Sequence, residues 1–211
     1  MTIVMQYRDA TMRMTSERKT ETRERILHAA IALFRVNGID AVGVDAIMHH
    51  AGMTHGGFYA HFASKEALVA EAAAASLARS AARWERISEE PDSAAALERI
   101  VVSYLDPAHV AAAEQGCVLT TLGPEVARRR EVKPAITESV RRMADALARC
   151  LPGRRREQAL TVLSSMVGAV VLARLSDDPQ LSAELLATAR KTAGVPPRAD
   201  LVNATPVEVP S

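Results

Sequence analysis

Histidine side chains gather in the N-terminal third of this chain. Five of its six histidines lie there, namely His28, His49, His50, His55 and His61. An imidazole can bind a metal ion, donate a hydrogen bond to a phosphate or reach the edge of a base. No two of these histidines have the i, i+4 spacing of a helical metal clamp, and no cysteine lies near them. We therefore expect phosphate contact or surface placement, and no metal site.

The residues needed for catalysis are not found in a recognisable arrangement. The sequence has no Ser/His/Asp or Cys/His constellation and no glycine-rich phosphate loop. The two cysteines, Cys117 and Cys150, lack the CxxC spacing of a metal site and are too few for a disulfide framework. We expect a protein that is not an enzyme and has no cofactor.

Composition points to an all-α protein. Hydrophobic residues make up 48% of the 211 residues but aromatic residues only 3%, and alanine, the best helix former, is abundant. A net charge of +1 gives no bulk argument for nucleic-acid binding, so that argument must rest on local placement. The N-terminus lacks the apolar core of a signal peptide, and the longest apolar stretch, residues 166–173, is far below the roughly 20 residues of a membrane span. We expect a cytoplasmic protein with no membrane partner.

The N-terminal part of the chain predicts two short helices joined by a tight turn. Residues 1–17 show no sustained periodicity and are expected to form a flexible arm, followed by a first helix from near Thr22 to Asn37. A second helix is expected over about 44–51 and a third over 55–61, with Gly52 in the turn between them. Such a pair is a helix-turn-helix. Thr54 and Ser64 are expected to cap the third helix and a long fourth helix over about 65–87.

The rest of the chain predicts further helices and a polar tail. Proline positions and apolar periodicity divide it into segments near 93–105, 108–115, 121–130, 134–151, 155–175 and 181–192. The proline-rich end is expected to be disordered. The predicted domains are an arm over 1–17, a helix-turn-helix domain over 18–65, a helical regulatory and dimerisation domain over 66–194 and a tail over 195–211.

Residues 44–68, VDAIMHHAGMTHGGFYAHFASKEAL, resemble the DNA-binding segment of the TetR family. The matching elements are Ala-Gly-Met-Thr at 51–54, Phe-Tyr-Ala-His-Phe at 58–62 and Ser-Lys-Glu-Ala-Leu at 64–68. The resemblance implies a three-helix DNA-binding domain followed by a larger helical domain that binds ligand and forms the dimer. It also implies a homodimeric repressor on a palindromic operator of double-stranded DNA, released by a small-molecule inducer.

The third predicted helix has the side chains expected of a DNA-reading element. If Phe58 and Phe62 face the core, then Gly56 and Ala60 face outward and leave the helix backbone free to enter the major groove. One departure from the family pattern is Gly43, which stands where relatives carry Ser or Thr. The expected DNA contacts are Arg23, Val44, Thr54, His55, Gly56, Gly57, Tyr59, His61 and Lys65.

Two later helices carry apolar stripes that suit either a dimer interface or the core of one chain. The stripe over 136–150 alternates steps of four and three, and the helix over 155–175 adds small residues that permit close approach of a second helix. The resemblance favours a four-helix bundle between two copies, although packing within one chain stays an alternative. The expected interface residues are Val140, Met143, Leu147, Leu163, Val167, Gly168 and Val171.

The regulatory domain offers one candidate sensor and few aromatic residues. Trp84 and Tyr104 are the only aromatic residues after Phe62, so an aliphatic pocket for a smaller or apolar inducer is expected. Gly116-Cys117 resembles a TetR subgroup in which some members sense electrophiles through cysteine. Cys117 is therefore either a candidate sensor or a buried small hydrophobe.

Overall fold

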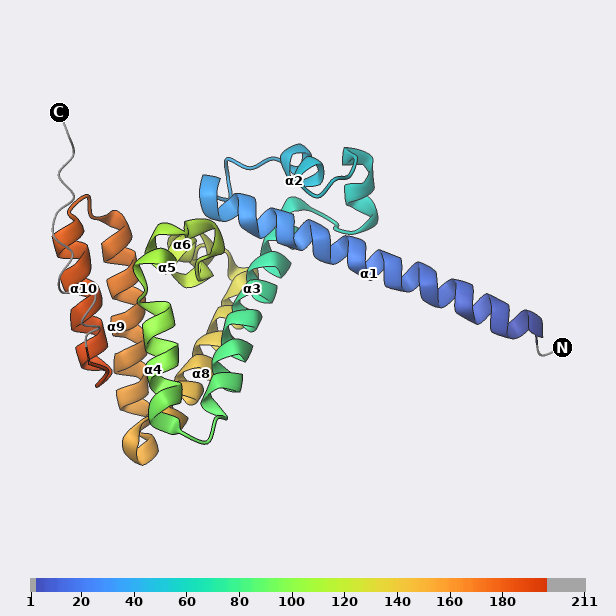
Figure 1. Cartoon of the computed structure of the whole chain (residues 1–211). Helices are drawn as coiled ribbons and strands as arrows, with labels where there is room; N and C mark the ends of the chain where they lie inside the picture. The colour runs from blue at the N-terminus through green and yellow to red at the C-terminus, as the bar shows by residue number, and fades with distance from the viewer. Residues whose placement is uncertain (1–2, 197–211) are drawn as a thin grey trace, which may run out of the picture.

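The protein is helical throughout the part of the chain that the structure describes. The computed structural model describes the backbone of residues 3–196 and the side chains from residue 17 onward. Within that range every regular element is an α-helix or a 3₁₀-helix, so the predicted all-α class is confirmed. Figure 1 shows a bundle of long helices with a smaller N-terminal unit on one end.

The N-terminal unit consists of α1 (Ile3–Asn37), α2 (Val44–His50) and η1 (His55–Ala60), and α3 (Lys65–Ser88) leads from it into the bundle. The predicted position of α3 is confirmed, and Ser64 caps it by accepting a hydrogen bond from the Ala67 N–H at 3.1 Å. The third helix differs from the prediction because it is a 3₁₀-helix. Thr54 occupies its N-cap position, but the Thr54 side chain makes no capping hydrogen bond.

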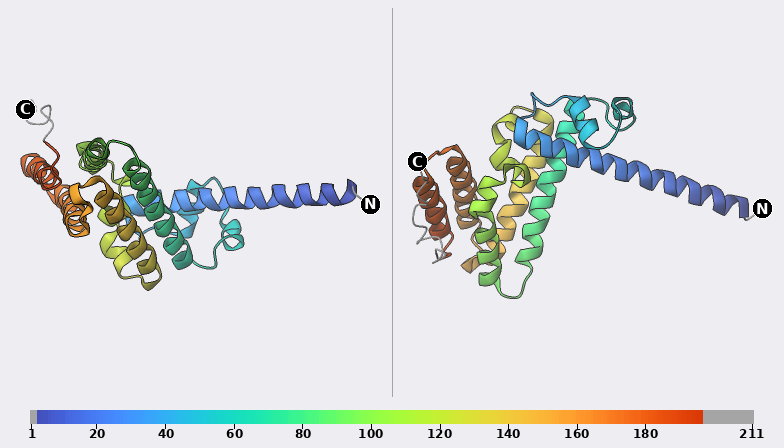
Figure 2. Two further views of the ribbon diagram at one scale, coloured as in Figure 1. Left: turned by 90° about the horizontal axis from the view of Figure 1, so that it is seen from below. Right: turned by 45° about the horizontal axis from the view of Figure 1, so that its top comes forward.

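The start of α1 was predicted wrongly. The helix begins at Ile3 instead of near Thr22, and its N-terminal half extends well beyond the rest of the molecule (Figures 1 and 2). The prediction relied on an apolar stripe, which residues 3–21 lack. The same residues contain no proline or glycine and are rich in good helix formers, so helix propensity favours a helix there even where the sequence has no apolar stripe.

One hydrophobic core joins the N-terminal unit to the body. Phe58 and Phe62 stack at 5.8 Å between ring centroids and are buried with the inner face of α1 and with Ile47 of α2. Leu68 of α3 and Val126, from a segment far along the chain, belong to the same cluster. The N-terminal unit is therefore seated on the body and does not form a separate globule.

The body is a bundle of five longer helices connected by short ones (Figures 1 and 2). Besides α3 these are α4 (Ser93–Tyr104), α8 (Lys133–Cys150), α9 (Arg156–Leu175) and α10 (Pro179–Thr192). The predicted segments 108–115 and 121–130 are broken into shorter pieces. These pieces are α5 (Pro107–Ala111), η2 (Ala113–Gln115), α6 (Val118–Thr121), α7 (Gly123–Ala127) and η3 (Arg130–Val132), and η4 (Pro152–Arg154) connects α8 to α9.

The C-terminal end of α10 continues in an ordered turn. Gly194 has a φ of +75°, which suits glycine, and the Val195 N–H donates to the Arg190 carbonyl at 3.1 Å, as in a Schellman motif. Val195 is buried in the body. The predicted tail therefore starts too early at residue 195, because the hydrophobic contact after the glycine holds Val195 in place. Residues 197–211, where the tail was predicted, lie outside the described residues.

Among the described helices, α9 is long and apolar enough by length and composition to cross a membrane. However, 39% of its most apolar window is buried within the fold, and α8 and α10 pack against it. A core helix of a soluble protein passes the same test. The apolar character of α9 is accounted for in part by this packing and in part by an exposed face described below.

Candidate nucleic-acid interface, junction and cavity

A glycine turn sets the angle between α2 and η1. Gly52 has a φ of +71°, a left-handed conformation that a side chain would strain, and the Met53 N–H donates to the Met48 carbonyl at 2.8 Å. The Arg25 guanidinium donates to the Ala51 carbonyl at 2.7 Å and so ties the turn to α1. The predicted helix-turn-helix is therefore present, with a 3₁₀-helix as its second element.

The outward face of η1 carries little side-chain volume. Thr54, His55 and Gly56 are exposed, and no other described atom lies within 4 Å of the place where a Gly56 Cβ would be. Gly57 points the other way, with its Cβ position 3.6 Å from the Met48 Cε atom. Tyr59 is 67% exposed at the edge of this face. Gly56 therefore faces outward, whereas Gly57 packs inward.

His55 is held in place by Asp45, which the sequence reasoning missed. The His55 Nδ1 atom pairs with the Asp45 carboxylate across the two elements of the helix-turn-helix. Because a carboxylate only accepts, Nδ1 carries the proton, and Nε2 of a neutral ring is left as an acceptor. The Tyr59 ring packs edge-on against the same imidazole, with 6.2 Å between the ring centroids. His55 thus presents one defined nitrogen to the outside.

Arg23 holds α1 against the elements that follow it. Its guanidinium donates to the Glu71 carboxylate at 2.6 Å and to the His61 carbonyl, and it lies over the Phe62 ring at 4.2 Å from the centroid. These contacts occupy both terminal nitrogens. The predicted contact of Arg23 with DNA would require breaking them, so in this structure Arg23 is a brace for η1 and α3.

The remaining expected DNA contacts are half-buried around the exposed face. Lys65 donates to the Asp40 carbonyl at 3.4 Å, and Val44 lies at the start of α2. Burial, and then the positive charges of Lys19 and Arg23, lower the pKa of His61. Its Nδ1 atom is covered and has no partner among the described residues, so only Nε2 can meet a ligand.

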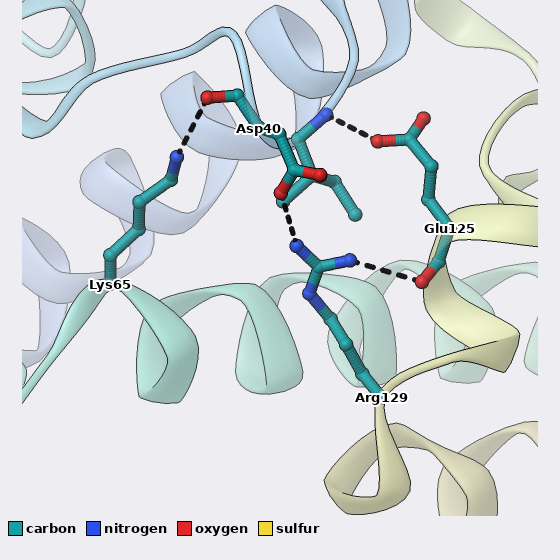
Figure 3. Close-up of polar contacts among 5 residues, drawn as sticks. Asp40, Lys65, Glu125 and Arg129 are labelled. Atoms are coloured by element: carbon teal, nitrogen blue, oxygen red, sulfur yellow. Dashed lines mark hydrogen bonds and ion pairs between the residues drawn. The ribbon is translucent and has the colours of Figure 1, made fainter.

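Glu125 of α7 and Arg129, which follows α7, bind the loop after α1, as Figure 3 shows. The Glu125 carboxylate accepts a hydrogen bond from the Ile39 N–H at 2.7 Å. Arg129 donates to the Asp40 carboxylate at 2.7 Å and to the Glu125 carbonyl at 3.0 Å. We name Ile39, Asp40, Glu125 and Arg129 the junction. Nothing in the sequence pattern indicated it, because its partners are far apart in the chain.

A cavity of about 330 Å³ lies between α3, α4 and α5. Trp84 and Tyr104 meet there edge-to-face, with 5.4 Å between their ring centroids. The expectation of an aliphatic pocket was wrong, because the only two aromatic residues of the body converge from different helices. The cavity is lined by Ser80, Arg83, Trp84, Ser103, Tyr104, Ala108, His109, Ala112, Gln115 and Cys117.

Cys117 forms part of the cavity wall and is buried. It is 6% exposed at the N-cap of α6, and burial raises the pKa of its thiol. The positions of Arg35 and Tyr104 oppose this effect without overcoming it. A low thiolate fraction means slow reaction with electrophiles, so the structure favours the buried interpretation of Cys117 over the sensor interpretation.

His109, whose Nε2 atom accepts from the Cys117 N–H, is expected to make the free energy of unfolding depend on pH. Its Nδ1 donates to the Tyr104 carbonyl at 2.6 Å, and burial, aided by Arg174 and Arg83, lowers its pKa although Asp106 opposes this. An unfolded histidine takes up its proton below about pH 6.5. The contribution of neutral His109 to the free energy of unfolding is therefore full above that pH. It is lost as the pH falls toward the lowered pKa of His109 in the folded state.

We predict that the melting temperature falls between pH 7.5 and pH 5.5 and that His109→Asn makes this fall smaller. Asparagine keeps a donor near the position of Nδ1 but cannot titrate. His49→Asn, on an exposed position of α2, is the control and should retain the wild-type fall. Thermal melts monitored by circular dichroism at four pH values decide. Equal pH dependence in all three proteins would contradict the assignment.

The expected dimer residues divide into two groups. Met143, Leu147 and Leu163 are 1%, 0% and 4% exposed in the single chain. Met143 and Leu147 lie on the face of α8 that packs within the chain against α3, α4 and α9, and Leu163 is buried on α9, so these three residues have little surface left for a second copy. Val140, Val167, Gly168 and Val171 are half-buried and keep some accessible surface.

A different apolar surface is exposed on α9. Leu160, Leu172 and Leu175 are exposed, the last at 77%, and Leu181 is exposed on α10, which packs against α9. Ser164 and Gly168 lie between the leucines at steps of four, so small residues occupy the middle of the stripe. We name Leu160, Ser164, Gly168, Leu172 and Leu175 the α9 stripe.

The histidine-rich unit does not assemble a metal site in the part of the chain that the structure describes. No group of three or more His, Cys, Asp or Glu side chains there is arranged to hold a metal ion. His55 is paired with Asp45, and His28 lies by Arg79 at 2.6 Å.

Comparison with known proteins places this architecture. Residues 26–72 match the family model described as bacterial regulatory proteins, tetR family. An uncharacterized HTH-type transcriptional regulator, YerO of Bacillus subtilis (strain 168), is 36% identical over 70 residues. That match covers 33% of this chain and 24% of YerO, so the likeness to YerO is confined to one segment.

Solved structures resemble the chain over most of its length. The reduced form of NemR from E. coli superposes with a TM-score of 0.67 at 20% identity, covering 81% of this chain and 96% of NemR. A TetR-family regulator from Agrobacterium tumefaciens gives a TM-score of 0.68 at 18% identity, with 83% and 97% covered. The fatty acid degradation regulator FadR from Bacillus halodurans gives 0.62 at 16% identity, with 82% and 95% covered.

The helix-turn-helix and the helical body that follows it give this chain the architecture of these solved structures. Residues 26–72 are similar to bacterial regulatory proteins of the tetR family, and the chain shares the fold of solved TetR-family regulators.

Proposed function

We propose that this chain is a cytoplasmic, homodimeric repressor that binds a palindromic operator and is released by a small molecule. The observation that carries the proposal is the exposed face of η1, nearly free of side chains at Gly56 and flanked by His55 and Tyr59. A backbone with little side-chain volume can approach the floor of the major groove closely. A half-site read by one such face requires a second copy for a full operator.

His55 and its neighbours divide the work of reading and positioning in this proposal. The fixed tautomer of His55 leaves an Nε2 acceptor that suits the exocyclic amino group of adenine or cytosine. Tyr59, Thr54 and Lys65 supply donors to phosphates on either side, which set register and carry no sequence information. Discrimination at the base pairs beneath Gly56 then depends on groove shape.

The α9 stripe supports the proposed dimer. An exposed apolar stripe with small residues at its centre permits two helices to pack closely about a two-fold axis. Leu181 extends the surface onto α10. The proposed dimer surface therefore lies on α9 and α10, whereas the sequence analysis expected it on the two helices over 134–151 and 155–175.

The route from cavity to DNA in this proposal is short. Gln115 and Cys117 line the cavity, and the adjacent Glu114 carbonyl accepts a hydrogen bond from Arg35 of α1 at 3.1 Å. The same segment continues into α7, where Glu125 holds the Ile39 N–H of the junction. A ligand that displaces residues 113–127 acts on both ends of this connection and so biases the orientation of the N-terminal unit. The buried thiol of Cys117 favours a non-covalent ligand.

Selection of bound duplexes from a random library tests the proposal. We expect an inverted repeat, whose symmetry reflects the dimer, and an affinity that falls roughly 10³-fold between 50 and 200 mM salt if about six phosphates are contacted. Recovery of unrelated sequences without a shared motif would argue against sequence-specific binding.

Gly43→Ser is expected to strengthen DNA binding. Gly43 is the N-cap of α2 in an extended conformation, and no described atom lies within 4 Å of its Cβ position. A serine there fits without strain and adds a hydroxyl for the helix N-terminus and for a passing phosphate. We predict roughly fivefold tighter binding, equivalent to about 1 kcal/mol, measured by fluorescence anisotropy. Gly43→Ala is the control without a hydroxyl, and an equal gain in that variant would contradict the phosphate role.

A further inference from the structure

We infer that the cavity between α3, α4 and α5 binds a small aromatic or conjugated carboxylate. This inference rests on the proposed function, because it names the class of ligand that releases the DNA. It is drawn from three features of the cavity: its charge, a buried donor and two aromatic walls.

The charge of the cavity favours an anion. Arg83 is its cationic lining residue, and no Asp or Glu occurs among the described residues that line it. His109 adds no positive charge, because both ring nitrogens have the roles of a neutral imidazole. Its Nδ1–H group donates a hydrogen bond to the Tyr104 carbonyl, and its Nε2 atom accepts one from the Cys117 N–H at 3.4 Å. Glu90, which lies near Arg83 in a neighbouring hollow, is paired with Arg99. A guanidinium that forms no ion pair is a natural partner for a ligand carboxylate, which it can bind through two parallel hydrogen bonds.

The hydroxyl of Tyr104 is a buried donor without a partner. Tyr104 is 7% exposed, and its hydroxyl has no partner in good hydrogen-bond geometry among the described residues, although the Cys117 thiol and the Thr120 hydroxyl lie near enough to influence its pKa. Burial raises the pKa of this phenol well above its usual value, so the hydroxyl keeps its proton. An unpaired polar group in such a place costs free energy. A ligand oxygen that accepts from Tyr104 removes that cost, so the free cavity is prepared for an acceptor.

The aromatic walls of the cavity and its volume narrow the class of ligand further. Trp84 and Tyr104 meet at 5.4 Å and Tyr104 and His109 at 4.9 Å, each pair edge-to-face. Such walls favour a planar π-system, which can stack on one ring and meet the edge of another. At about 330 Å³ the cavity is at the lower end of the range for small-molecule sites. One or two rings fit with a carboxylate at the Arg83 end.

Calorimetry with cinnamate and its neutral analogue cinnamamide tests the inference. The two compounds share size and planarity and differ in charge. We expect wild-type protein to bind cinnamate at least roughly tenfold more tightly than cinnamamide, since hydrogen bonds to charged groups are the stronger ones. Arg83→Gln should remove this preference, and Tyr104→Phe should weaken cinnamate several-fold.

Arg86→Gln is the matched control. Arg86 is exposed one turn along α3 and does not line the cavity, so this variant should keep the wild-type preference. Equal affinity for the two compounds in the wild type, no cinnamate binding at 10 mM, or the same loss in Arg86→Gln and Arg83→Gln would overturn the inference. Binding of the ligand-free protein to the selected duplex is measured on the same preparations. Duplex binding without cinnamate binding would reject the ligand class alone, and absence of duplex binding would reject the proposed function.

Discussion

The Gly168→Leu variant is expected to be a folded monomer that binds the operator roughly a hundredfold more weakly than the wild type. No other described atom lies within 4 Å of the place where a Cβ of Gly168 would be, so the larger side chain has room within one chain. In the proposed dimer it meets the same position of a second copy and forces the α9 stripes apart. Each reading head then binds alone and loses the effective concentration that a dimer provides, a factor of roughly 10²–10⁴.

Light scattering on the purified variant gives its mass, and fluorescence anisotropy gives its affinity for the selected duplex. Ala95→Leu adds the same side chain to an exposed position of α4 and should leave a dimer with full affinity. An intact dimer for Gly168→Leu would remove the α9 stripe from the interface. A monomer that still binds the operator at wild-type affinity would separate dimerisation from DNA binding.

The Gly56→Leu variant is expected to bind the operator roughly ten- to hundredfold more weakly while its thermal stability is unchanged or higher. The open space around Gly56 means that leucine clashes with nothing in the described part of the protein. If the η1 backbone lies against the groove floor, the added side chain must displace it, at an overpacking cost of roughly 1–3 kcal/mol. Gly56→Ala should give a smaller loss, because it adds a single methyl group.

Gly123→Leu and Gly123→Ala are the matched controls. Gly123 also has open space around its Cβ position and lies on a different element, α7. Affinities and melting temperatures of the four variants are compared under one salt concentration. Equal losses at the two glycines, or no loss at Gly56, would be incompatible with close approach of η1 to the groove.

The DNA-binding unit was largely predictable because its residues are constrained locally. The turn at Gly52, the buried pair Phe58 and Phe62 and the cap Ser64 each impose a conformation on their neighbours, and all were expected from the sequence. The 3₁₀ geometry of η1 was not, because six residues between a turn and a loop give too little periodicity to separate it from an α-helix.

Features that depend on contacts between distant residues were not predictable in the same way. The stripe through Met143 and Leu147 shows which face of α8 is buried, but periodicity cannot say whether the same chain or a second copy covers it. The cavity likewise arises because Trp84 and Tyr104 lie on different helices that converge. Asp45 beside His55 and Glu125 beside Ile39 belong to the same class of contact.

The most direct test of the central claim is the affinity and stoichiometry of the chain on the selected duplex. Fluorescence anisotropy at 150 mM salt compares this duplex with a scrambled one of the same composition, and light scattering gives the mass of the complex. We predict at least roughly 10³-fold preference for the selected sequence and a complex with an even number of chains on the inverted repeat. Equal affinity for both duplexes, or a single chain bound at saturation, would contradict it.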